Sequence, residues 1–87
     1  MARRVRFTRH AHEKFSILAT HGFVVSEEQV RQMVLAPDRV EDYGSEQIAQ
    51  KRVSDTHVLR IVYRVENGEI IVITFYPGRR RRYEDSV

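Results

Sequence analysis

A stretch of alternating β-branched and aromatic residues near the C-terminus restricts the fold of this chain more than any other feature. It runs from His57 to Tyr76, reads HVLRIVYRVENGEIIVITFY, and is interrupted only by Glu66-Asn67-Gly68. Asn-Gly between two such runs is the strongest short-range signal for a β-hairpin. The sequence therefore predicts two long antiparallel strands joined by a tight turn, against which the rest of the chain packs.

The register of this hairpin decides which side chains share a face, because a shift of one residue moves every side chain to the opposite face. A two-residue loop at Asn67-Gly68 pairs Arg64 with Ile71 and Arg60 with Phe75, and both faces then mix charge with hydrocarbon. A three-residue loop with a bulge at Gly68 gives one wholly apolar face, so we expect that register. Its pairs are Tyr63/Ile71, Ile61/Ile73 and Leu59/Phe75 on the apolar face, and Arg64/Ile70, Val62/Val72, Arg60/Thr74 and Val58/Tyr76 on the other.

Two helices are predicted before the hairpin. Thr8 is suited to cap a helix that runs to about His21. Ser26 and Gln29 form the pattern of a capping box, in which each side chain bonds the backbone N–H of the other residue. Pro37 ends this second helix, because the residue before a proline avoids the α region.

Short alternating segments at 38–43 and 47–53 predict two more strands, and residues 3–7 predict a short strand or an extended arm. Strands joined by tight turns are antiparallel, and a run of helices followed by a run of strands is typical of α+β proteins. We expect two N-terminal helices on one face of a four-stranded antiparallel sheet. The other face should stay open and carry Arg60, Arg64 and Tyr76.

The length and composition indicate one domain. The chain has 87 residues, which suits a single domain over residues 1–87, with a folded core at 5–78 and a basic tail at 79–87. It has no cysteine, so disulfides and thiolate metal sites are excluded. We see no apolar run of membrane-spanning length and no apolar signal core after the basic start, so we expect a cytoplasmic protein without membrane contact.

The positive charge lies at the two ends of the chain. The formal net charge is +3, yet residues 10–78 hold 7 basic and 10 acidic side chains. The first nine residues and residues 79–82 each contribute +4. Basic segments of this kind suggest a polyanionic partner, nucleic acid first, although solvated tails that aid solubility have the same composition.

The side chains available for chemistry suit metal-independent cleavage of RNA. His10 and His12 point to different sides of a helix, so we expect no metal site, and we expect no cofactor. Cleavage by the RNA 2′-hydroxyl needs a base, an acid and cations near the phosphate. His10, Arg60 and Tyr76 are the catalytic candidates, although each also has an ordinary structural interpretation. The candidate RNA-contacting residues are Lys14, Lys51, Arg64, Arg79, Arg80 and Arg81.

Three segments resemble a family of small bacterial and archaeal proteins grouped with the RelE/ParE-like toxins. They are FTRHAHEKF, SEEQVRQMVLAPDRVE and HVLRIVYRVENGEIIVITFYPGRRR, and HGFVVSEEQVRQMVLAPD is also similar to BrnT-type toxins. The resemblance places the family's helix histidine on His10 and its helix arginine on Lys14, which keeps the charge but not the planar fork. The family's hairpin arginine falls on Arg60, and its tyrosines fall on Tyr63 and Tyr76.

This resemblance implies two helices on an antiparallel sheet and a toxin of a toxin–antitoxin pair. Ribonuclease members of the superfamily cleave messenger RNA without a metal, often on the ribosome, whereas ParE-like members act on gyrase. We therefore expect RNA or the ribosome and a small antitoxin protein as partners. Two alternatives stay open from the residues: a nucleic-acid-binding module and a protein-binding module, neither of them catalytic.

Overall fold

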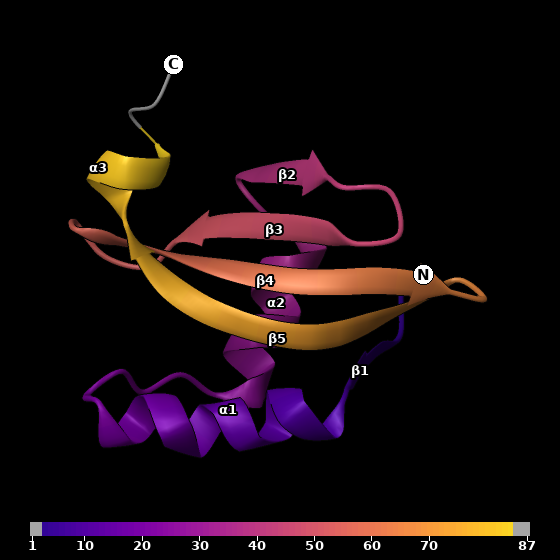
Figure 1. Cartoon of the computed structure of the whole chain (residues 1–87), viewed down its shortest axis with the longest axis horizontal. Helices are drawn as coiled ribbons and strands as arrows, with labels where there is room; N and C mark the ends of the chain where they lie inside the picture. The colour runs from indigo at the N-terminus through magenta and orange to yellow at the C-terminus, as the bar shows by residue number, and fades with distance from the viewer. Residues whose placement is uncertain (1–2, 85–87) are drawn as a thin grey trace.

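Residues 3–84 are described by the computed structural model, in which one five-stranded sheet carries three helices (Figure 1). The sheet order is β1-β5-β4-β3-β2; β1 runs parallel to β5, and all other neighbours are antiparallel. The elements are β1 (Val5–Phe7), α1 (Arg9–Thr20), α2 (Glu27–Leu35), β2 (Arg39–Asp42), β3 (Gln47–Arg52), β4 (His57–Glu66), β5 (Glu69–Arg79) and α3 (Arg80–Tyr83).

The predicted α+β class is confirmed, and the four antiparallel strands are present as β2 to β5. The short strand allowed for residues 3–7 is present as β1, and it makes the sheet five-stranded and mixed: β1 lies parallel to the first half of β5, with Val5 opposite Ile70. We predicted residues 79–87 to be a basic tail. The part of that segment that is described contains the end of β5, α3 and Glu84, and residues 85–87 lie outside the described residues.

Thr8 ties the start of α1 to the sheet. Its side chain accepts a hydrogen bond from the Ala11 N–H at 3.2 Å, as predicted for a helix cap. The same hydroxyl donates to the Ile73 carbonyl, and the Thr8 N–H donates to the Val72 carbonyl, both at 3.0 Å. Because β1 ends at Phe7, the first turn of α1 takes its place beside the second half of β5.

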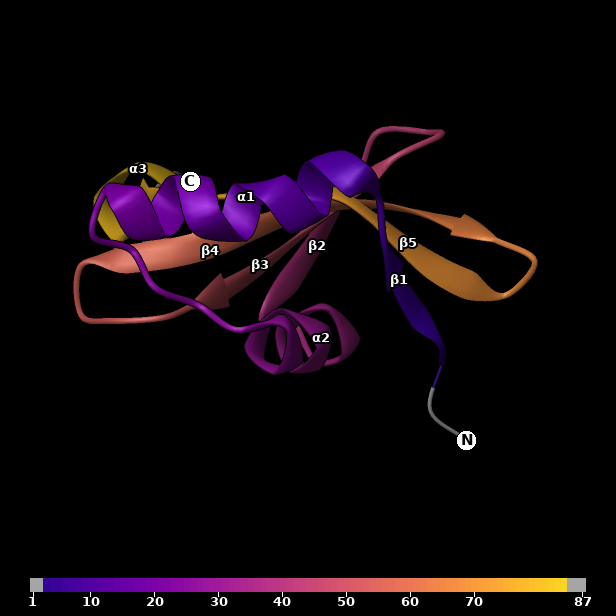
Figure 2. The same cartoon turned by 90° about the horizontal axis from the view of Figure 1, so that it is seen from below.

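The capping box that begins α2 is also confirmed. The Ser26 N–H donates to the Gln29 side chain at 2.8 Å, and the Gln29 N–H donates to the Ser26 hydroxyl at 3.1 Å. The helix ends at Leu35, two residues before Pro37. Figure 2 shows α1 lying across the view while α2 is seen end-on, so the two helices run in different directions beneath the same sheet.

Both helices pack on one face of the sheet. The core residues of β4 are Leu59, Ile61 and Tyr63, which the sequence placed on the helix side. Phe75 of β5 is fully buried and its ring lies 4.7 Å from that of Phe15 in α1. The helices contribute Ala11 and Leu18 from α1, and Val30 and Val34 from α2.

The predicted three-residue hairpin loop is wrong. Asn67 and Gly68 have φ angles of 50° and 80°, and Glu66 pairs with Glu69, so the loop has two residues. Positive φ at both central positions gives a turn whose twist matches that of the strands, and Asn-Gly is its preferred sequence. Near the turn, Arg64 therefore pairs with Ile71.

Further along the hairpin, a bulge makes the sheet face toward the helices apolar in both strands. The register shifts between Val62 and Tyr63, and from there Ile61 pairs with Phe75 and Arg60 with Tyr76. A bulge adds one residue to one strand and so exchanges its faces locally. As a result Ile70 and Val72 join the helix-side core in place of the predicted Ile71 and Ile73, whereas the face assignments of β4 stand.

Candidate functional site

Arg60, in the middle of β4, lies on the sheet face opposite α1 and α2. Its Nε donates to the Tyr76 hydroxyl at 3.1 Å, and its Nη2 donates to Glu41 at 2.9 Å. Its Nη1 donates to the side-chain oxygen of Gln50 at 2.5 Å. We expected this face to be open, but Arg60 is only 4% exposed.

The C-terminal helix α3 supplies the cover over Arg60. The Tyr83 ring lies 4.3 Å from the Arg60 guanidinium carbon, which is a favourable cation–π distance. We call Arg60, Glu41, Gln50, Tyr76 and Tyr83 the Arg60 network. The predicted open face is therefore wrong at its centre, because a residue of the expected tail packs on it.

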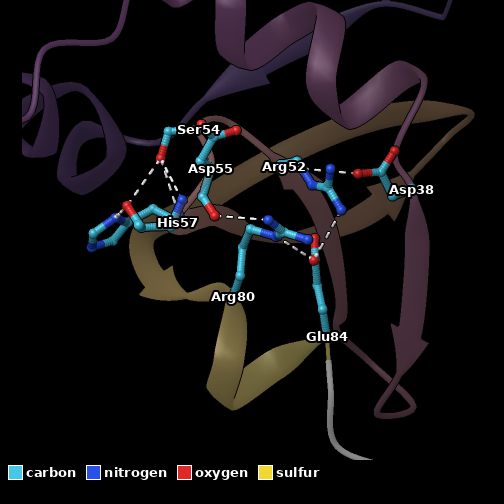
Figure 3. Close-up of polar contacts among 8 residues, drawn as sticks. Asp38, Arg52, Ser54, Asp55, His57, Arg80 and Glu84 are labelled. Carbon is cyan, nitrogen blue, oxygen red and sulfur yellow. Dashed lines mark hydrogen bonds and ion pairs between the residues drawn. The ribbon is translucent and has the colours of Figure 1, made fainter.

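Polar contacts hold α3 in this position (Figure 3). The Arg80 N–H donates to the Thr56 carbonyl at 2.8 Å, and the Arg80 side chain donates to the Asp55 carbonyl at 2.7 Å. Glu84 accepts from Arg80 at 2.6 Å and from Arg52 at 3.3 Å. These contacts join α3 to β3 and to the turn between β3 and β4.

Charge pairing explains how Arg60 is tolerated inside. Hydrogen bonds from Arg60, and then from Tyr43, lower the pKa of Glu41 to about 2. Burial alone would lower the pKa of Arg60, but the hydrogen bonds with Glu41 and Tyr76 outweigh it and raise that pKa. Both groups are thus held in their charged forms, as buried ions require partners.

This pairing predicts a loss of stability in acid that depends on Glu41. A carboxyl whose pKa is depressed on folding stabilises the protein above its unfolded pKa, and that contribution disappears as the pH falls toward the folded pKa. Between about pH 6 and pH 3, Glu41 should account for about 1 kcal/mol of lost unfolding free energy, because water screens part of the interaction of this partly exposed carboxylate. Urea unfolding at both pH values, compared with Glu41→Gln, measures this. Equal losses in the two proteins would contradict it.

Gly78 makes room for Tyr83. A Cβ on Gly78 would lie 2.6 Å from Cδ2 of the Tyr83 ring, far inside carbon–carbon contact distance. Gly78→Ala should therefore displace Tyr83 and speed hydrogen exchange of the Arg80 amide, which bonds Thr56. The expected cost is about 1–3 kcal/mol. In a Tyr83→Ala background the same change should cost far less, and equal costs in both backgrounds would show that Tyr83 does not occupy this space.

His10 approaches the same face from the start of α1. Its ring Nε2 lies 3.1 Å from the Thr74 hydroxyl, and the ring is exposed. Thr74 pairs with Val62 and Tyr76 pairs with Arg60, so these two side chains of β5 share the face opposite the core. We call His10, Thr74 and Tyr76 the β5 row. Arg60 is bonded to the row at Tyr76, and His10 is bonded to it at Thr74.

Only half of the candidate RNA-contacting residues lie together. Lys51 pairs with Asp38 at 3.3 Å and lies on the helix side of β3, and Arg64 is ion-paired with Glu66 near the hairpin tip. Lys14 is half-buried one helical turn after His10. The remaining candidates lie at the far end of β5, where Asp55, Thr56, Arg79, Arg80 and Arg81 line a cavity of about 370 Å³.

Two residues of this site were missed in the sequence: Glu41 and Gln50. Gln50 lies directly opposite Arg60 in β3, and Glu41 lies in the next strand, β2. A buried arginine needs a carboxylate, so a correct strand register would have directed attention to Glu41. The sequence places Tyr83 in the basic tail and gives no local signal that its ring packs on Arg60.

No group of three or more His, Cys, Asp or Glu side chains within residues 3–84 is arranged to hold a metal ion. None of the helices in that range is both long enough and apolar enough to span a membrane. No protein-family model matches the chain, and no significant match was found among curated proteins or solved structures. The resemblance to RelE/ParE-like toxins therefore stays an expectation.

Proposed function

We propose that this protein is a cytoplasmic, metal-independent endoribonuclease of a toxin–antitoxin type system. The observation that carries the proposal is the β5 row, in which an exposed imidazole and a phenol flank a hydroxyl on one sheet face. Exposed arginines adjoin this row along the chain: Arg9 precedes His10, and Arg79 and Arg81 follow Tyr76 where β5 meets α3. The resemblance of the helix and hairpin segments to RelE/ParE-like toxins supports the same class.

In this mechanism His10 is the base and Tyr76 the acid. His10 removes the proton of the RNA 2′-hydroxyl, whose oxygen attacks the adjacent phosphorus, and Tyr76 donates a proton to the departing 5′-oxygen. The products are a 2′,3′-cyclic phosphate and a free 5′-hydroxyl. The Tyr76 oxygen accepts from Arg60, which orients the phenol and leaves its own proton for donation.

The structure changes the role proposed for Arg60. Its donors are directed to Tyr76, Glu41 and Gln50, and Tyr83 covers it, so we now assign it to positioning Tyr76. The extra phosphate charge then falls to exposed cations such as Arg9, Arg79 and Arg81. Bidentate arginine–phosphate pairs are well suited to that task.

The burial of Arg60 also favours a second candidate, a protein that binds RNA without cleaving it. The cation closest to Tyr76 is then structural, and only exposed arginines face the polyanion. Binding of this kind is dominated by phosphate contacts, and its affinity falls steeply with salt. Both candidates predict that the protein binds RNA, but only the ribonuclease predicts cleavage products.

Labelled RNA incubated with the protein in EDTA, with and without ribosomes, distinguishes the candidates. Products with 2′,3′-cyclic phosphate and 5′-hydroxyl ends support the ribonuclease. Salt-dependent binding without products supports the binding module. If neither products nor binding are found in either setting, both candidates are wrong, and a protein partner such as an antitoxin or gyrase becomes the next target. Glu46→Gln changes an exposed residue away from the row, and as a control variant it should give the same products and the same binding as the wild type.

A further inference from the structure

A second cavity lies on the helix side of the sheet, on the face opposite the Arg60 network. Its volume is about 610 Å³, within the range of small-molecule sites in proteins. It is formed where the connection between α1 and α2 runs past the turn between β3 and β4 (Figure 2). Neither the proposed ribonuclease nor the binding module uses it.

Hydrocarbon forms much of the wall. Phe23 and Val25 come from the connection, Met33 from α2, and Val53 and Pro77 from the end of the sheet. Phe23, Met33 and Val53 are partly buried against the core. A ligand with a flat or compact apolar body would remove this surface from water, which is the usual source of affinity in such sites.

Two histidines supply polar groups that the fold leaves unused. The His21 Nδ1 lies 2.9 Å from the Ile17 carbonyl and must donate to it, and the His57 Nδ1 lies 2.8 Å from the Thr56 hydroxyl. Within residues 3–84, no partner is found for either Nε2 atom. Once protonated, each Nε2 becomes a charged donor.

The other polar residues of the cavity are already engaged. Gln29 closes the capping box, the Ser54 hydroxyl accepts from the His57 N–H at 3.1 Å, and the Arg52 side chain pairs with Glu84. The residues that line the cavity include no aspartate or glutamate. No carboxylate of the lining therefore repels an anion.

We propose that this cavity binds a small organic acid, with its carboxylate at His21 and His57 and its apolar body against Phe23, Met33 and Val53. Hydrogen bonds from the N–H groups of the two imidazoles would orient the carboxylate. The apolar wall would select acids with an aromatic or branched hydrocarbon part. The site is separate from the β5 row, so this proposal does not depend on the proposed ribonuclease activity.

The test uses 2-naphthoate as the probe and its neutral isostere 2-naphthalenemethanol as the comparison, each titrated into the full chain and followed by amide NMR. Naphthoate should shift the amides of residues 21–25 and 52–57 saturably and bind at least about fivefold more tightly than the alcohol. His57→Gln and His21→Gln should each remove most of that preference while leaving alcohol binding unchanged. His12→Gln, a histidine change in α1 outside the cavity, should alter neither affinity.

Equal affinity for acid and alcohol in the wild type would overturn the assignment of the two histidines. Absence of saturable shifts with both compounds, or shifts centred on β5 row residues, would overturn the site itself. If His57→Gln loses its dispersed spectrum, His21→Gln carries the test, because that ring is exposed at the helix end and its loss leaves the sheet intact. Retention of the full naphthoate preference in His21→Gln would then contradict the proposal.

Discussion

Glu41→Gln is expected to lower the unfolding free energy by about 3–5 kcal/mol, because it leaves the buried Arg60 guanidinium without its counter-charge. Glutamine has nearly the shape of glutamate but supplies a single neutral acceptor. Arg60 cannot reach water from its position beneath Tyr83, where it is 4% exposed. A domain of this size has only about 5–15 kcal/mol of stability, so a large part of the total would be lost.

Urea unfolding followed by circular dichroism at about pH 7 measures this effect. Glu46→Gln removes the same charge from an exposed site, and its cost should stay within about 0.5 kcal/mol. In the double variant Glu41→Leu/Arg60→Met both charges are removed, and most of the stability should return, because apolar replacement of a buried pair is often neutral or better. A cost of Glu41→Gln as small as that of Glu46→Gln would show that Arg60 is not dependent on Glu41.

His10→Gln is expected to slow RNA cleavage about 100-fold or more, which is the usual contribution of a general base. The exposed ring bonds Thr74 from the surface of α1, so the unfolding free energy should change by no more than about 0.5 kcal/mol. Initial cleavage rates in EDTA, with RNA below the binding constant and again at saturation, separate a loss of catalysis from a loss of affinity.

Tyr76→Phe provides the partner measurement. It removes the phenol proton while keeping the ring beside Arg60, so cleavage should fall by a similar factor and RNA affinity should stay near that of the wild type. His12→Gln, on a neighbouring position of α1 but outside the row, is the matched control. Wild-type rates in His10→Gln would remove His10 from the mechanism, even if Tyr76→Phe were inactive.

The helix starts were predictable because the groups that cap them are close in sequence. Thr8 bonds the N–H three residues later, and the Ser26–Gln29 capping box spans three residues as well. The alternation of β4 was equally local, and it placed Leu59 and Ile61 in the core and Arg60 on the other face. His10 and Tyr76 were named for their chemistry, and in the structure His10 bonds Thr74, whose side chain lies on the same sheet face as that of Tyr76.

The register of the β4–β5 hairpin could not be predicted from local sequence. The choice of a three-residue loop rested on obtaining a clean apolar face along the whole of both strands. The hairpin instead has the favoured two-residue Asn67-Gly68 turn. A bulge opposite Val62 and Tyr63 shifts the register and so changes which β5 side chains face the helices. At the bulge Thr8 bonds the Val72 and Ile73 carbonyls, and the alternation of residues within one strand does not predict contacts of this kind with a distant segment.

By itself the sequence determined the α+β class, the helix caps, the position of the hairpin and the sides of β4, because short-range hydrogen bonds and side-chain periodicity decide those features. Only the tertiary structure decided that Arg60 is buried and paired, since its partners Glu41, Gln50 and Tyr83 come from three other segments of the chain. Burial of a charge depends on which distant groups converge on it. An arginine that alternates with apolar residues in a strand can therefore face solvent or be paired and covered, and the local sequence does not distinguish the two cases.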